Sequence, residues 1–149
     1  MGSDAIARAV AAVHQYNVTC APTISQYVAL EAFSDPRWFD AVRPHIARQR
    51  GIVLEAVERQ LALPMVPSEG AMYAFVDFTR VAPRSIPLAE RLLAEADVLT
   101  IPGAAFGEAG EGFLRITYGA NPKDEETVEG LRRIVTWMAA NESKGSRHG

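Results

Sequence analysis

The segment covering residues 98–119 constrains the fold of this chain more than any other stretch. It reads VLTIPGAAFGEAGEGFLRITYG, in which two apolar runs flank a turn rich in glycine. This pattern predicts two strands, 98–101 and 112–118, joined by that turn. A single arginine, Arg115, lies inside the second apolar run. A guanidinium in such surroundings costs free energy unless an anionic group pairs with it, so the identity of its partner bears directly on function.

The partner of Arg115 is either an acidic side chain of the protein or the carboxylate of a ligand. Side chains alternate along a strand, so the apolar face carries Leu114, Ile116 and Tyr118, and the opposite face carries Phe113, Arg115 and Thr117. The apolar face can pack on helices while Arg115 projects from the other. A guanidinium meets a carboxylate with two parallel hydrogen bonds. Within the protein, Asp77 on a neighbouring predicted strand is a candidate for that carboxylate.

The turn between the two strands is the second feature that could contribute to a ligand-binding site. The segment from Gly103 to Gly112 contains four glycines, Gly107 among them, together with Phe106, and Pro102 directly precedes it. Glycine lets a backbone approach a ligand closely or adopt a positive φ. The spacing alone favours a flexible hairpin loop. It is not a dinucleotide-binding fingerprint, because no strand–GxGxxG–helix unit is present.

The remaining pattern predicts an α+β fold. Helices are expected over residues 5–15, from Thr23 onward, over 37–62 and 88–96, and from Asn121 to about Ala140, with a strand over 72–78. Asp4 and Thr23 are candidate helix caps, and Pro44 is expected to kink the long helix or mark its true start. Leu88, Leu92 and Leu93 should face inward, as should Val128, Leu131, Ile134, Val135 and Met138 of the last helix.

These elements form a small, mainly antiparallel sheet of three to four strands covered by helices, preceded by N-terminal helices that include one long one. We expect three segments: N-terminal helices over 1–62, an α/β sandwich over 63–141 and a disordered tail over 142–149. The first two helices have apolar faces that must pack on something, either on this domain or on another chain or domain.

Composition excludes several classes of protein. The chain has 149 residues and a net charge of -3, so it has no basic excess to bind a phosphate backbone, and we expect no nucleic-acid partner. No apolar run approaches the roughly 20 residues that span a membrane. The single cysteine, Cys20, and the widely separated histidines indicate neither a disulfide framework nor a metal site. We expect a cytoplasmic protein.

Taken together, the segments resemble the C-terminal (small) domain of class I/II aminotransferases, the fold-type I enzymes that depend on pyridoxal phosphate. The resemblance runs from about Ala5 to Ala140. It rests on the order and spacing of Ile24-Ser25-Gln26, the long arginine-rich helix, PSEGAMY over 67–73, PGAAFG over 102–107 and FLRI over 113–116. Most family members carry two glycines before the aromatic strand, and here the second is Ala71.

The resemblance implies that Arg115 binds the α-carboxylate of an amino-acid or 2-oxo-acid substrate. It also implies that Pro102, Gly103, Phe106 and Gly107 form a loop beside that substrate. The N-terminal segment, residues 1–62, would then contain an interdomain helix. No catalytic, cofactor-binding or metal-binding residue is assigned in this chain.

The chemistry of the family requires a lysine that binds pyridoxal phosphate covalently. This chain has only Lys123 and Lys144, and neither lies in the Ser-Lys context of the family. We therefore expect the chain to begin just beyond that segment, to bind no cofactor by itself and to be inactive alone. Its partners would be the large domain or a complementary chain, with a second copy of itself as a further candidate. The alternative is a non-catalytic α+β module that binds a small carboxylate or a protein partner.

Overall fold

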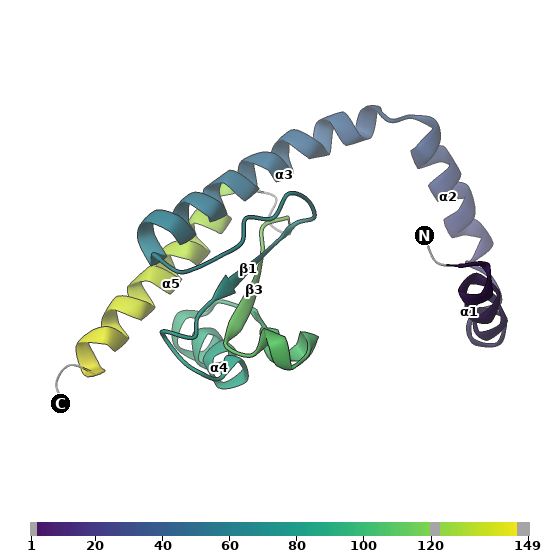
Figure 1. The fold of residues 1–149 in the computed structure, drawn as a ribbon. Helices are drawn as coiled ribbons and strands as arrows, with labels where there is room; N and C mark the ends of the chain where they lie inside the picture. Colours follow the sequence, from purple (N-terminus) through teal and green to yellow (C-terminus); the bar gives the residue numbers. More distant parts are fainter. Residues whose placement is uncertain (1–2, 120–122, 146–149) are drawn as a thin grey trace. The chain divides into compact units, whose positions relative to one another are not determined.

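The computed structural model describes residues 3–119 and 123–145 (Figure 1). The chain divides into two compact units, Met1–Val42 and Arg43–Gly149. In the described part of the chain, no helix has the length and apolar character needed to cross a bilayer. The predicted division of the chain at residue 62 stays a prediction.

The first unit contains α1 (Asp4–Asn17), α2 (Thr23–Ser34) and the first residues of α3 (Arg37–Ala56). Asp4 and Thr23 are the first helical residues and not the predicted caps, because Ser3 and Pro22 occupy the cap positions and neither makes a side-chain capping bond. Before the third helix, the Asp35 carboxylate accepts the backbone N–H of Arg37 at 3.0 Å.

Neither α1 nor α2 buries a single residue. The apolar side chains along them are at least half exposed, and they include Ile6, Val10, Val13, Tyr16, Ile24, Tyr27, Val28, Leu30 and Phe33. Burying a large aliphatic or aromatic side chain contributes roughly 1.5–3 kcal/mol, which these residues do not gain within their own unit. The unit therefore presents apolar helix faces that remain free for another surface.

The second unit is built on a three-stranded sheet in the order β1-β3-β2, and both pairings are antiparallel. Its strands are β1 (Tyr73–Asp77), β2 (Ile101–Pro102) and β3 (Phe113–Thr117). The predicted strand over 98–101 is wrong over most of its length, because pairing with β3 begins only at Ile101. Pro102 has no N–H to donate, which helps to keep this edge strand short.

Three longer helices contribute residues to the core beside the sheet. The helix α3 runs through Pro44 without a break and continues into a π-helical turn, η1 (Val57–Leu61). The helix α4 (Ser85–Ala96) begins before the predicted Leu88, and α5 (Asp124–Gly145) extends beyond the predicted end near Ala140. The predicted helix start at Asn121 and Pro122, and residues 146–149 of the predicted tail, lie outside the described residues.

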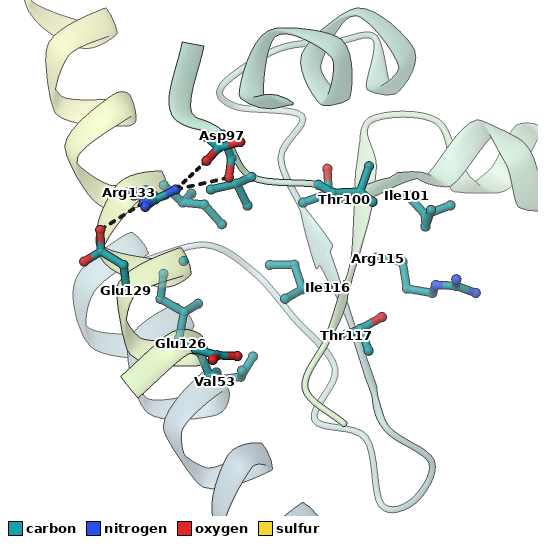
Figure 2. A pocket seen from close by; sticks show the side chains of 16 residues that line it. Val53, Asp97, Thr100, Ile101, Arg115, Ile116, Thr117, Glu126, Glu129 and Arg133 are labelled. Carbon is teal, nitrogen blue, oxygen red and sulfur yellow. Dashed lines mark hydrogen bonds and ion pairs between the residues drawn. The ribbon is translucent and has the colours of Figure 1, made fainter. Parts of the chain in front are cut away.

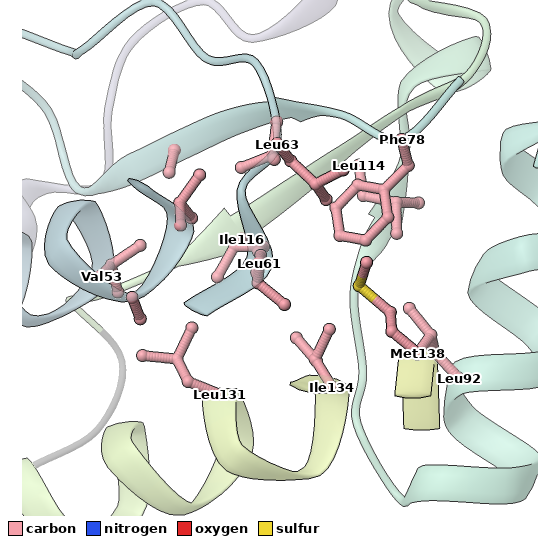
Figure 3. Close-up of a cluster of buried hydrophobic side chains, with 14 of the residues drawn as sticks. Val53, Leu61, Leu63, Phe78, Leu92, Leu114, Ile116, Leu131, Ile134 and Met138 are labelled. Carbon is pink, nitrogen blue, oxygen red and sulfur yellow. The ribbon is translucent and has the colours of Figure 1, made fainter. Parts of the chain in front are cut away.

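One apolar face of the sheet forms the core, as the alternation in β3 predicted. Leu114, Ile116 and Tyr118 are buried together with residues of α3, α4 and α5, among them Val53, Leu88, Leu92, Leu131, Ile134 and Met138 (Figure 3). Two predicted core positions are wrong. Leu93 and Val128 are 48% and 50% exposed, because the buried stripes of their helices run through neighbouring positions.

The loop that leads into β1 is held by the buried Tyr118. The Tyr118 hydroxyl lies 3.0 Å from the Ser68 hydroxyl and donates to the carbonyl of Gly70 at 3.3 Å. Ala71, the residue that replaces the family's second glycine, has a φ of 61° in this loop. The left-handed conformation is unfavourable for an L-residue with a Cβ, so the departure noted in the sequence carries a strain cost.

We expect Ala71→Gly to raise the free energy of unfolding by about 1 kcal/mol, because glycine adopts a positive φ without steric cost. Urea unfolding monitored by circular dichroism measures the change. The control is Ala139→Gly on the exposed face of α5, which should lower stability by about 1 kcal/mol. Equal destabilisation by both variants would contradict the role of the backbone angle.

Candidate functional site

Arg115 projects from the face of the sheet opposite the core. Phe113, Arg115 and Thr117 are each half-buried, whereas the residues between them are buried. The Arg115 Cζ lies over the ring of Tyr73, 4.4 Å from its centroid, and over the ring of Phe106 at 5.0 Å. Figure 2 shows the guanidinium pointing away from Ile116 and from the side of the sheet that carries α5. The predicted orientation of Arg115 is confirmed.

Within the described residues, no carboxylate pairs with Arg115, and its Nε is buried without a hydrogen-bond partner. The alternative partner, Asp77, is directed elsewhere. One of its oxygens accepts the Thr79 hydroxyl at 2.6 Å and the Thr79 backbone N–H at 2.8 Å. These bonds, the hydroxyl first, hold the pKa of the Asp77 carboxyl below its usual value. An internal ion pair with Asp77 is therefore wrong.

Aromatic rings continue across this face beyond the guanidinium. Phe75, which lies directly opposite Arg115 in the ladder, stacks on Phe113 with centroids 5.0 Å apart. It also meets Phe106 edge to face, with centroids 6.0 Å apart. The negative faces of aromatic rings attract a cation, so the rings partly replace the missing carboxylate.

The turn before β3 is more ordered than a simple hairpin. It forms two short 3-10 helices, η2 (Gly103–Phe106) and η3 (Glu108–Gly110), separated by Gly107 at a φ of 111°. Pro102 lies in β2, and Phe106 closes η2. A Cβ added at Gly103 would overlap the carbonyl oxygen of Gly110 and would lie 2.8 Å from that of Phe113. The two 3-10 helices therefore pack backbone against backbone, which only glycine allows.

Hydrogen bonds attach this loop to the start of α4. The backbone N–H of Ala104 donates to the buried Ser85 hydroxyl at 3.1 Å. The Glu111 carboxylate accepts the backbone N–H of Ser85 at 2.6 Å and that of Gly112 at 3.1 Å. These bonds, the one from the Ser85 backbone first, hold the pKa of Glu111 below its usual value. Glu111 thus caps α4 from a distant segment of the chain and fixes the base of the loop.

A separate cavity of about 550 Å³ lies beside the edge of the sheet, between residues 97–101 and α5 (Figure 2). Its rim carries an ion pair between Arg133 and Asp97 at 3.0 Å, and Arg133 also pairs with Glu129 at 2.9 Å. The Thr100 hydroxyl is buried there without a partner. Arg115 contributes to the wall of this cavity, but its guanidinium points to the other side of the strand.

The residues around Arg115 suit a carboxylate and do not suit a covalently bound aldehyde cofactor. Binding such a cofactor requires an amine, and none of the described residues that contact Arg115 carries one. Lys123 is exposed and directly precedes α5. Among the described residues, the groups in contact with Arg115 are therefore aromatic rings and not amines.

Comparison with known proteins identifies the family. The model of the aminotransferase class I and II family matches residues 1–134. The aromatic-amino-acid aminotransferase 2 of Thermococcus litoralis is 36% identical over 124 residues, which cover 80% of this chain and 32% of that protein. A probable aspartate/prephenate aminotransferase of Aquifex aeolicus is 37% identical over 134 residues, covering 86% and 33%.

Solved structures agree with this. An aminotransferase from Mycobacterium tuberculosis superposes with a TM-score of 0.78 at 27% identity, covering 92% of this chain and 36% of that one. The chain belongs to the class I and II aminotransferases, fold-type I enzymes that use pyridoxal phosphate. It spans about a third of the length of the relatives it matches.

The sequence singles out Arg115 and the loop, and it does not indicate the groups that contact them in the structure. The ring of Tyr73 contacts the guanidinium, a contact that the sequence-based predictions do not include. A signal was present, because Tyr73 and Phe75 alternate onto one face of their strand. Glu111 and Ser85 gave no signal, since their contact joins segments whose proximity the sequence pattern does not encode.

We expect Glu111→Gln to remove a pH-dependent contribution to the stability. A carboxyl whose pKa is lowered in the folded state stabilises the fold above its unfolded pKa, near the ordinary value of 4.5, and loses that contribution as the pH falls below it. The Tm of the wild type should therefore fall more steeply than that of Glu111→Gln below about pH 4.5. Parallel Tm curves between pH 3 and 7, as rough limits, would contradict the capping role.

Proposed function

We propose that this chain supplies the substrate-carboxylate-binding portion of a pyridoxal-phosphate-dependent aminotransferase. The observation that carries the proposal is the Arg115 guanidinium, which has no acidic partner among the described residues. It is held over two aromatic rings on the face of the sheet away from the core. A cation in this position gains most from a ligand that brings a negative charge with a planar pair of oxygens.

The ligand is the α-carboxylate of an amino acid or of the matching 2-oxo acid. Both share the carboxylate, so one guanidinium serves both half-reactions of an amino-group transfer. The loop with Pro102, Gly103, Phe106 and Gly107 borders the same face, since Phe106 contacts Arg115. In this role Arg115 binds and orients the substrate and takes no part in proton transfer.

The remaining groups come from another polypeptide segment. The family uses a lysine to hold pyridoxal phosphate, which stabilises negative charge at the substrate α-carbon, and the residues near Arg115 include none. The exposed apolar faces of α1 and α2 support a partner surface, which would be a large domain, a complementary chain or a second copy. The chain by itself would then be inactive.

We expect the 149-residue chain, incubated with pyridoxal phosphate, to show no visible absorption band of a Schiff base. After borohydride reduction, we expect no cofactor to remain covalently attached to the protein. The reason is that neither Lys123 nor Lys144 lies in the Ser-Lys context of the family. The measurement is an absorption spectrum after borohydride treatment and gel filtration. A stoichiometric, reduced adduct on Lys123 would overturn this element of the proposal.

Mixing the chain with the large-domain polypeptide of a relative should produce transaminase activity. In that reconstituted enzyme, we expect Arg115→Lys to lower kcat/KM for the amino acid, because an ammonium cannot form the paired hydrogen bonds. The fall should correspond to a loss of roughly 2–4 kcal/mol of transition-state stabilisation. Steady-state kinetics with varied amino acid measure the effect. A kcat/KM that stays at the wild-type value would leave Arg115 as a structural residue and favour the non-catalytic module.

A further inference from the structure

The Arg115 side chain is long and flexible, and among the described residues it contacts aromatic rings and forms no salt bridge. A free arginine side chain carries up to about 2 kcal/mol of rotamer entropy, which a ligand must remove on binding. Contacts that restrict the side chain before a ligand binds would reduce this entropy loss, and the described contacts of Arg115 are with aromatic rings. The cation lies 4.4 Å from the centroid of Tyr73 and 5.0 Å from that of Phe106.

We propose that Tyr73 and Phe106 are positioning residues that hold the Arg115 guanidinium ready for the substrate carboxylate. This inference rests on the proposed function and adds the two residues that prepare its arginine. Both rings act through Arg115 and need not touch the reacting atoms. The pair is named here the aromatic clamp.

The register of the sheet explains how Tyr73 reaches Arg115. Phe75 lies directly opposite Arg115 in the ladder, and Tyr73 lies opposite Thr117. Tyr73 is therefore a diagonal neighbour of Arg115 on the same face, a separation that long side chains bridge. The loop before β1 sets this placement, because the buried Tyr118 hydroxyl binds the backbone of that loop.

Phe106 reaches Arg115 from a different element. It lies at the end of η2, and the contact between Gly103 and Gly110 closes the loop that carries it. The Phe106 ring also contacts Phe75 edge to face, so it packs against a second aromatic ring besides its contact with Arg115. Two rings from separate segments of the chain thus converge on one cation.

The buried Nε of Arg115 indicates which edge of the guanidinium remains for a ligand. Nε has no hydrogen-bond partner and is shielded, so it is not the edge that meets solvent. Arg115 as a whole is half-buried, and Phe106 is 54% exposed. The buried atom of the guanidinium is thus Nε, and the terminal nitrogens are the edge that this inference assigns to the carboxylate.

The exposure of the two rings makes the proposal testable without unfolding the protein. Tyr73 is 38% exposed and Phe106 is 54% exposed, so replacing either by leucine keeps apolar bulk and removes little buried area. We expect Phe106→Leu and Tyr73→Leu each to raise KM for the amino acid about 5-fold to 30-fold in the reconstituted enzyme, with a much smaller change in kcat.

Two companion variants separate positioning from structure. Tyr73→Phe keeps the ring and should restore most of the KM lost in Tyr73→Leu. Leu99→Ala, at a side chain that is 74% exposed and does not contact Arg115, should leave kinetics unchanged. Tm values of all variants are compared with the wild type. A rise in KM that follows a fall in Tm, or that Tyr73→Phe does not rescue, would overturn the clamp.

A spectroscopic readout on the 149-residue chain is independent of activity. In a nitrogen-15 correlation spectrum, the Arg115 Nε–H signal should be shifted by the adjacent rings and slow to exchange, and its loss in Arg115→Lys assigns it. Phe106→Leu should move this signal toward that of an exposed arginine and speed its exchange. An unmoved signal overturns the clamp.

The outcomes also separate this inference from the proposed function. If Arg115→Lys lowers kcat/KM while the leucine variants leave KM unchanged, the carboxylate role stands and the clamp is wrong. If Arg115→Lys leaves kcat/KM unchanged, both are wrong. Both are supported if Arg115→Lys lowers kcat/KM for the amino acid and the leucine variants raise its KM.

Discussion

The contact of the Arg115 cation with aromatic rings, in the absence of an acidic partner among the described residues, is the interaction on which the candidate site depends. Arg115 could have been neutralised within the sheet, because Asp77 lies on the same face of β1 as Phe75, the residue opposite Arg115. Instead, the Asp77 carboxylate binds Thr79. The fold thereby keeps a guanidinium available, at a cost in stability that a bound carboxylate would offset.

The two faces of the sheet differ in what they carry: one forms the core, and the other carries the candidate site. Leu114, Ile116 and Tyr118 pack against helices and make the sheet rigid, while the opposite face carries Arg115 and the rings. The same strand serves both purposes because its side chains alternate. Around it, Glu111 and the Tyr118 hydroxyl tie two loops to this scaffold, so that groups far apart in the sequence are held at fixed positions.

Much of this arrangement could be predicted from the residues alone. The apolar alternation around Arg115 predicted its direction, and the order of motifs predicted the family. The strand over 98–101 was wrong because β-branched residues indicate an extended chain but not a ladder partner. The clamp was beyond the pattern, since a contact between Phe106 and Arg115 depends on how a loop closes and not on local periodicity.

The contact between Gly103 and Gly110 has a consequence for how this segment can change. Since the two backbones touch, neither site has room for a methyl group. Inserting or deleting a residue between them would separate the surfaces that meet. The length of this segment is thus fixed as firmly as its two glycines, and variation should be confined to exposed positions such as Ala105 and Glu108.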